Sequence, residues 1–278
     1  MDENIRTFDF KTLPIEIEIK DLEFVRELPK LFGQAHKANF YQIVWITEGE
    51  AKFYIDFRNI TIKANEVLII SSGQVFVFDT QSDYSGKIIL FTSNFFTITE
   101  LDSNFLHTSK IINPINLNQI VPICPQLMEN LTTLLEECLK YPVDGFQKGI
   151  AQSLLRVILL ETERQLSTSC PLIINNTGRK FCNAVERHFK ESRNTEYYVN
   201  LLGINEKTLS KEVKVLSGKT PKVYIDSRII LEAKRLLSYS ALSVKEIGFE
   251  LGFDEPTNFN KYFRKHTGAT PIQFRESI

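Results

Sequence analysis

The sequence has few cysteines, no long apolar run and almost no net charge. Its four cysteines form no CxxC pair, which argues against a zinc finger or a redox dithiol and fits a reducing cytosol. They are Cys124, Cys138, Cys170 and Cys182. No apolar stretch approaches the ~20 residues of a membrane span, because the densest one, at 154–160, is interrupted by Arg156. The first ten residues lack the basic start and apolar run of a signal peptide, so we expect a cytoplasmic protein with no membrane partner.

The charge is small in total but unevenly distributed along the chain. The formal net charge is −1, yet residues 1–174 carry 15 Lys and Arg against 22 Asp and Glu, whereas residues 175–278 carry 18 against 12. A basic C-terminal part on an acidic body indicates that a polyanion binds one end only, with a chance split of charge as the alternative.

The N-terminal part has the pattern of short β-strands. Residues 40–47 are mostly aromatic and β-branched, residues 48–50 resemble a turn, and residues 51–57 show the alternating pattern of apolar and polar side chains that is typical of a strand. Further short strands are expected at 15–19, 60–62, 66–70, 75–78 and 87–91. This spacing predicts an antiparallel barrel or sandwich over about 15–120.

Apolar residues at helical spacing follow, and they predict helices at 125–139 and 146–166. A stretch rich in Ser, Thr and Asn predicts a linker at 169–178. We therefore expect an α+β multidomain chain, with an N-terminal domain at 1–168 and an all-α domain at 179–278.

The C-terminal part contains an internal repeat, in which residues 202–224 match residues 251–274. Leu209 matches Phe259 and Lys211 matches Lys261, each at an offset of 50 residues. Gly203 and Gly252 are offset by 49, so the second turn is one residue longer.

Each copy has the pattern of a helix-turn-helix. A short amphipathic helix, at 197–202 or 244–251, ends in Leu-Gly, and the glycine can take the left-handed conformation that ends a helix. Asn205 and Asp254 then suit the N-cap of a second helix, and Pro256 suits its first turn.

The second helices of the two copies are expected to bury Leu209, Val213 and Leu216, and Phe259, Tyr262 and Phe263. Their opposite faces carry residue types that bind phosphates and base edges. These are Lys207, Ser210, Lys211 and Lys214 in the first copy, and Thr257, Asn258, Asn260, Lys261, Arg264 and Lys265 in the second. A helix over 221–238, roughly 27 Å long, could hold the two faces about one DNA turn apart, roughly 34 Å. The alternative is a helical bundle with a duplicated helix pair.

Residues 229–274 resemble the signature of the AraC/XylS family of bacterial transcription regulators, and the run EAKRLLSYSALSVKEIGFELGFDEPTNFNKYFRKHTGATPIQFR at 232–275 carries the resemblance. The resemblance covers about 181–277 with specific motifs, and the N-terminal part resembles the family's cupin-type sensor domain. Gly248 and Val199 depart from the family's pattern, but neither is a DNA-contact position.

The resemblance implies a cytoplasmic, nucleoid-associated regulator without enzymatic activity or cofactor. Its expected partners are double-stranded DNA, RNA polymerase, a small-molecule effector and a second copy of the chain. Base-reading roles carry over to Lys207, Ser210, Lys211, Thr257, Asn258 and Lys261, with Asn260 as a further candidate. Lys211 and Lys261 stand where the family commonly has Arg, so they either read guanine or anchor phosphate.

The N-terminal domain lacks the residues of a cupin metal site. That pattern needs a His-x-His pair and a later His, but Ala38 stands where the pair with His36 needs its second His, and Phe76 stands at the later position. We therefore expect no metal, and His36 is either structural or a hydrogen-bond donor to an effector.

A barrel without metal can still hold a small molecule. Two sets of residues of the strand at 40–47 could face the cavity, and the sequence does not choose between them. They are Tyr41, Ile43 and Trp45, or Gln42, Val44 and Ile46. The candidate effector pocket is His36, Tyr41 and Trp45.

The helices within 125–166 have wide apolar stripes. One face is expected to cover the barrel, and the other either pairs with a second subunit or completes the core of the monomer. Two other classes of protein compete with a regulator. They are a cupin enzyme with a DNA-binding tail, and an interaction scaffold that has lost DNA binding.

Overall fold

The computed structural model describes residues 6–11, 13–26, 34–78, 82–99, 102, 103, 105, 106, 109–113, 115, 120–166 and 176–277. The chain divides into two compact units, of which one spans Arg6–Leu172 and the other includes Ile173–Ile278. Most of the linker predicted at 169–178 lies outside the described residues, and helix α6 begins at Asn176, so its last three residues are helical. Among the residues that the structure describes, no helix is long and apolar enough to cross a membrane.

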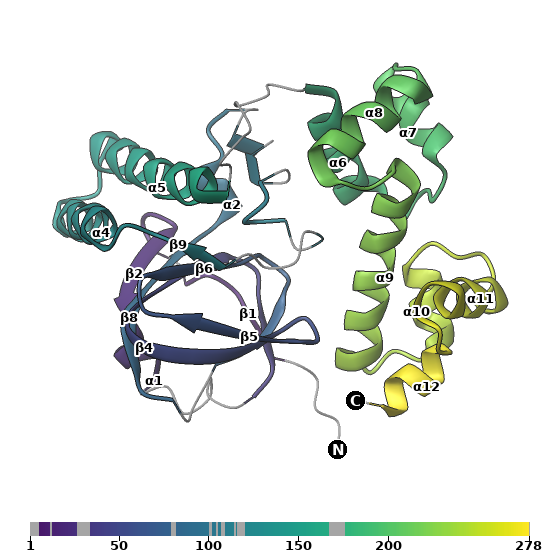
Figure 1. The fold of residues 1–278 in the computed structure, drawn as a ribbon, viewed down its shortest axis with the longest axis horizontal. Coiled ribbons are helices and arrows are strands. Elements are labelled where there is room, and N and C mark those ends of the chain that lie inside the picture. Colours follow the sequence, from purple (N-terminus) through teal and green to yellow (C-terminus); the bar gives the residue numbers. More distant parts are fainter. Residues whose placement is uncertain are drawn as a thin grey trace. The chain divides into compact units, whose positions relative to one another are not determined.

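The N-terminal unit is a curled sheet whose pairings are antiparallel, apart from the parallel pair β1 and β3 (Figure 1). Its strands are β1 (Arg6–Phe8), β2 (Ile17–Asp21), β3 (His36–Ala38), β4 (Tyr41–Ile55), β5 (Arg58–Lys63), β6 (Glu66–Ile70), β7 (Val75–Val77), β8 (Tyr84–Phe91) and β9 (Ile120–Pro122), with the short helix α1 (Leu22–Arg26) after β2. Strand β4 pairs with β5, β6, β7 and β8, so it holds the sheet together. The antiparallel β-domain expected from the sequence is confirmed.

The turn predicted at 48–50 is wrong, because β4 continues through it. The register against β8 shifts between Ile46 and Glu48, which marks a bulge. Gly49 has φ 79°, and a Cβ there would lie 2.2 Å from the carbonyl oxygen of Asp83, so only glycine fits. The chain reverses instead at Asp56 and Phe57, whose φ angles of 43° and 72° make a two-residue hairpin between β4 and β5.

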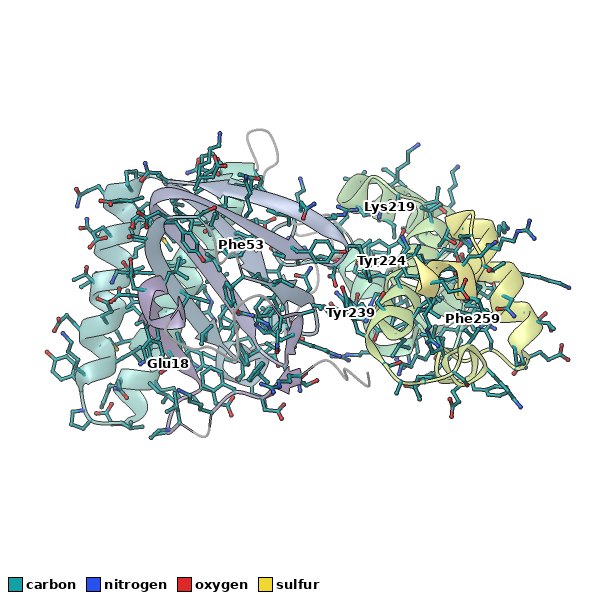
Figure 2. All side chains as sticks on the ribbon, turned by 90° about the horizontal axis from the view of Figure 1, so that it is seen from below. Glu18, Phe53, Lys219, Tyr224, Tyr239 and Phe259 are labelled. Atoms are coloured by element: carbon teal, nitrogen blue, oxygen red, sulfur yellow. The ribbon has the colours of Figure 1, made fainter. Side chains whose placement is uncertain are left out.

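The two faces of the sheet bury different sets of residues. Val44 and Ile46 lie in one cluster with Phe53, and Figure 2 shows Phe53 inside the barrel. Ile43 and Trp45 lie in a second cluster with residues of α4 (Pro125–Lys140) and α5 (Gly145–Leu166). These two helices lie side by side over that face in Figure 1, with the short helix α2 (Ser93–Phe96) packed on α5.

Polar contacts fasten α4 to the sheet and α5 to the short helix α2. Lys87 of β8 donates hydrogen bonds to Glu136 of α4 at 2.6 Å and to Asp21 at 3.1 Å. Gln152 of α5 donates its amide to the carbonyl of Phe95 at 2.6 Å. The expected role of one helix face, to cover the barrel, is therefore what the structure has.

The C-terminal unit consists of helices around α9. They are α6 (Asn176–His188), α7 (Thr195–Leu202), α8 (Glu206–Ser217), α9 (Pro221–Tyr239), α10 (Val244–Glu250), α11 (Pro256–Thr267) and α12 (Pro271–Glu276). In Figure 1, α6 to α8 gather at one end of α9 and α10 to α12 at the other. Tyr224 of α9 is fully buried at the first end, and Phe259 of α11 at the second (Figure 2).

Candidate DNA-binding surface

The structure builds two helix-turn-helix units from the repeated sequence. Helix α7 ends at Gly203, whose φ of 63° places it in the left-handed region. Gly252 ends the corresponding helix, α10, with φ 77°, and the N–H of Phe253 donates to the carbonyl of Gly248 at 2.9 Å. Both glycines therefore turn the chain into the second helix of their unit, as the sequence predicts.

The start of each second helix agrees with the prediction in one copy only. In α8 the side chain of Asn205 accepts a hydrogen bond from the N–H of Thr208 at 2.8 Å, so the predicted cap is confirmed. The cap predicted at Asp254 is wrong. Pro256 occupies the first turn of α11, so the N-cap falls on Glu255, whose side chain makes no cap bond. The Glu255 carboxylate accepts the hydroxyl of Thr257 instead, at 3.1 Å.

The outer faces of α8 and α11 carry the residues predicted to contact DNA. Both helices have 12 residues and stand 50 positions apart in the chain, and they bury the matched pairs Leu209 with Phe259 and Val213 with Phe263. Among the predicted contacts, five are exposed and two are half-buried. The exposed ones are Lys207, Lys211, Thr257, Asn258 and Lys261, and the half-buried ones are Ser210 and Asn260.

Thr208 is an exposed position on the same face that the sequence reasoning missed. The repeat could have found it, because Thr208 stands 50 positions before Asn258. Within the described part of the chain, no acidic side chain pairs with Lys207, Lys211 or Lys261, so these ammonium groups are available to a polyanion.

The candidate effector pocket is not a single site in the structure. His36 is 3% exposed, and its ring lies 4.0 Å from Phe76 and 5.5 Å from Phe8, measured between ring centroids. Its Nδ1 lies 3.0 Å from the carbonyl oxygen of Gln34, and burial lowers the pKa of the ring. Tyr41 and Trp45 lie on the other face of the sheet, in the cluster covered by α4 and α5.

The barrel interior therefore receives the second of the two residue sets, which contains Gln42. This side chain is 2% exposed, and its Nε2 has no hydrogen-bond partner among the residues that the structure describes. Across the described residues, no group of three or more His, Cys, Asp or Glu side chains is placed to hold a metal ion.

The geometry defines a protein in which a small curled β-domain is followed along the chain by two helix-turn-helix units. Comparison with known proteins agrees with each part. Residues 28–155 match the model of an AraC-like ligand binding domain, and residues 198–277 match that of a helix-turn-helix domain. The chain belongs to the AraC/XylS family of transcription regulators.

Individual relatives match different shares of the chain. The HTH-type transcriptional activator RhaS of Escherichia fergusonii is 30% identical over 92 residues, which are 33% of this chain and 33% of RhaS. The chain thus spans about a third of the length of the curated relatives it matches. The match to the solved structure of ToxT from Vibrio cholerae covers 94% of this chain and 98% of the ToxT chain, with 13% identity and a TM-score of 0.46. The C-terminal domain of AraT, a response regulator from Geobacillus stearothermophilus, covers 38% of this chain and 88% of its own, with 24% identity and a TM-score of 0.36.

Proposed function

We propose that this chain is a sequence-specific regulator of transcription that inserts α8 and α11 into successive major grooves of one DNA duplex. The observation that carries the proposal is the repeat of two 12-residue helices with the same buried and exposed positions. The 19 residues of α9, about 28 Å at 1.5 Å per residue, suit the separation of grooves about one DNA turn apart.

The two helices offer different chemistry to the bases. Asn258 and Asn260 of α11 suit adenine, which accepts and donates in the pattern of an amide. Lys207, Lys211 and Lys261 suit guanine or phosphate, and the hydroxyls of Ser210 and Thr257 suit several bases. The first-turn N–H groups of each helix can add a phosphate contact.

The N-terminal unit supplies regulation in this proposal. A small-molecule effector held by the β-domain, or a partner such as RNA polymerase, changes DNA affinity or polymerase contact by favouring one state of the protein. The site of action is the nucleoid in the cytoplasm. We infer no enzymatic role. A cupin enzyme with a DNA-binding tail is the second candidate, and a metal assay on the purified protein separates the two.

The exposed side of α5 supports a homodimer. Phe146, Ile150, Val157 and Leu160 repeat at helical spacing along it, with exposed fractions of 82%, 53%, 46% and 42%. Charged substitution of Ile150 and Val157 to Glu is expected to shift the protein to a monomer in size-exclusion chromatography with light scattering. Lys148→Glu, on the same helix and also exposed, is the matched control.

Selection of duplexes from a random pool by the full chain, at two salt concentrations, tests the proposal. We expect a site with two boxes about one helical turn apart, bound with an affinity that falls steeply as salt rises. A wild-type chain that enriches no duplex at low salt would contradict the assigned function.

A further inference from the structure

A group of five residues joins the two helix-turn-helix units beside α9. We call it the Asp226 cluster. It consists of Arg193, Lys222, Asp226, Phe253 and Tyr262. Arg193 precedes α7 of the first unit, Lys222 and Asp226 belong to α9, Phe253 lies in the turn of the second unit, and Tyr262 lies on α11.

Asp226 is the centre of the cluster. Its side chain is only 8% exposed, and its Oδ1 accepts hydrogen bonds from the hydroxyl of Tyr262 at 2.6 Å and from the ammonium of Lys222 at 2.7 Å. Burial, and then the bond to Asp226, raise the pKa of Tyr262, so its hydroxyl keeps the proton that it donates. This contact ties the recognition helix α11 directly to α9.

Arg193 closes the connection to the first unit. Its guanidinium donates to the carbonyl of Gly252 at 2.8 Å and lies 4.0 Å from the centroid of the Phe253 ring. Its own carbonyl accepts a hydrogen bond from Lys222 at 3.1 Å. Since the Phe253 ring lies 5.2 Å from that of Tyr262, the contacts form a closed ring through both units.

The backbones of the two units also approach closely at the edge of this ring. A Cβ on Gly252 would lie 1.8 Å from the carbonyl oxygen of Lys190. Lys190 in turn pairs with Glu250 at the end of α10. The second unit is therefore packed against the first, and α9 is not their only connection.

The internal repeat does not account for the cluster. The position that matches Tyr262 in the first copy is Glu212, which cannot supply the same ring and hydroxyl. Contacts that satisfy a buried carboxylate, here that of Asp226, fix the geometry of the elements they join, because a buried charge that loses its partners is costly.

We propose that Arg193, Asp226 and Tyr262 are positioning residues that fix α11 relative to α8 and so set the spacing between the two DNA boxes. The inference rests on the proposed function, since it needs a two-box operator. None of the three residues is assigned a base contact. They act by holding α8 and α11 in one rigid arrangement, which binds DNA boxes at one spacing and binds other spacings more weakly.

The test compares the spacing dependence of DNA binding between variants. The operator selected by the wild-type chain is made with its boxes at the native spacing and with one base pair added or removed. We expect the wild-type affinity to fall about tenfold or more for the altered spacings, the loss that one mismatched contact brings. Arg193→Ala with Tyr262→Phe is expected to reduce this penalty to about threefold or less, while binding at the native spacing weakens.

Arg187→Ala is the matched control, because Arg187 is an exposed arginine of the same unit outside the cluster. It should keep the wild-type penalty. Circular dichroism checks the fold of each variant. If the double variant does not fold, Tyr262→Phe, which removes a single oxygen atom, decides the question.

The outcomes separate the two proposals. A wild-type chain that selects no two-box site overturns the function and with it this inference. A wild-type chain that selects such a site, with folded variants that keep its full spacing penalty, overturns the inference alone.

Discussion

The close approach at Gly252 allows a sharp comparison with its repeat partner. Gly203 and Gly252 end corresponding helices with φ angles of 63° and 77°. A Cβ added at Gly203 would meet no described atom within 4 Å, whereas one at Gly252 would lie 1.8 Å from the carbonyl oxygen of Lys190 and 2.9 Å from its carbon. Gly203→Ala and Gly252→Ala therefore differ only in what the new methyl group meets.

The expected magnitudes follow from that geometry. A left-handed conformation costs an alanine about 1–2 kcal/mol, and this is the whole effect at Gly203. Overpacking against an atom that has to shift costs typically another 1–3 kcal/mol. We therefore expect Gly252→Ala to lower the free energy of unfolding of the C-terminal unit by about 2–5 kcal/mol.

Thermal unfolding of the full chain measures both effects. Far-ultraviolet circular dichroism follows the helices, and the fluorescence of Trp45, the single tryptophan, reports on the N-terminal unit. For a unit of about 100 residues, 1 kcal/mol corresponds to a shift of roughly 4–8 °C. Equal shifts for the two variants would refute the packing of Gly252 against Lys190, and with it part of the contact between the units.

Three other perturbations test separate parts of the structure. Burial holds the pKa of His36 below its ordinary value of 6.5, so the unfolded chain takes up a proton before the folded one as the pH falls. The free energy of unfolding should therefore fall as the pH drops below about 6.5. Trp45 fluorescence during urea unfolding measures this free energy, and His36→Gln should remove its dependence on pH. Gln42→Leu removes a buried amide with an unpartnered Nε2 and should stabilise the N-terminal unit by about 1 kcal/mol, which equal urea midpoints would contradict. Lys211→Ala with Lys261→Ala should weaken operator binding by a few kcal/mol in total, at ~1–3 kcal/mol for each base contact; unchanged gel-shift affinity, with Lys148→Ala as control, would mean that the recognition faces lie elsewhere.

Helices were the most predictable part of the chain, because their ends carry local signals. The helix predicted at 221–238 is observed at Pro221–Tyr239. Its start carries such a signal, since the hydroxyl of Thr220 accepts from the N–H of Val223 at 3.4 Å and Pro221 stands in the first turn. The cap at Asp254 failed because the proline two residues later determined where the helix begins. A proline in the first turn outweighs a good capping side chain upstream of it.

Strand β4 shows what a local pattern leaves out. Glu48-Gly49-Glu50 has the composition of a turn, yet Gly49 serves a bulge whose need for glycine comes from Asp83, far along the chain. The sequence did not predict which side chains of β4 face the barrel interior, for a similar reason. All residues from Tyr41 to Ile46 are buried, since the barrel interior covers one face and α4 and α5 cover the other. Alternation cannot separate two faces that are both apolar.

The repeat predicted the two reading helices but carried no information on what joins them. Comparison of the copies selects positions that the units share, such as Leu209 with Phe259, and these build each unit by itself. The residues that fasten one unit to the other need not match between copies, because the two units meet through unlike surfaces. Tyr262 stands where the first copy has Glu212, and only the structure shows that it reaches Asp226. In a duplicated domain, the positions at which the copies disagree are therefore the ones to search for residues that set their relative placement.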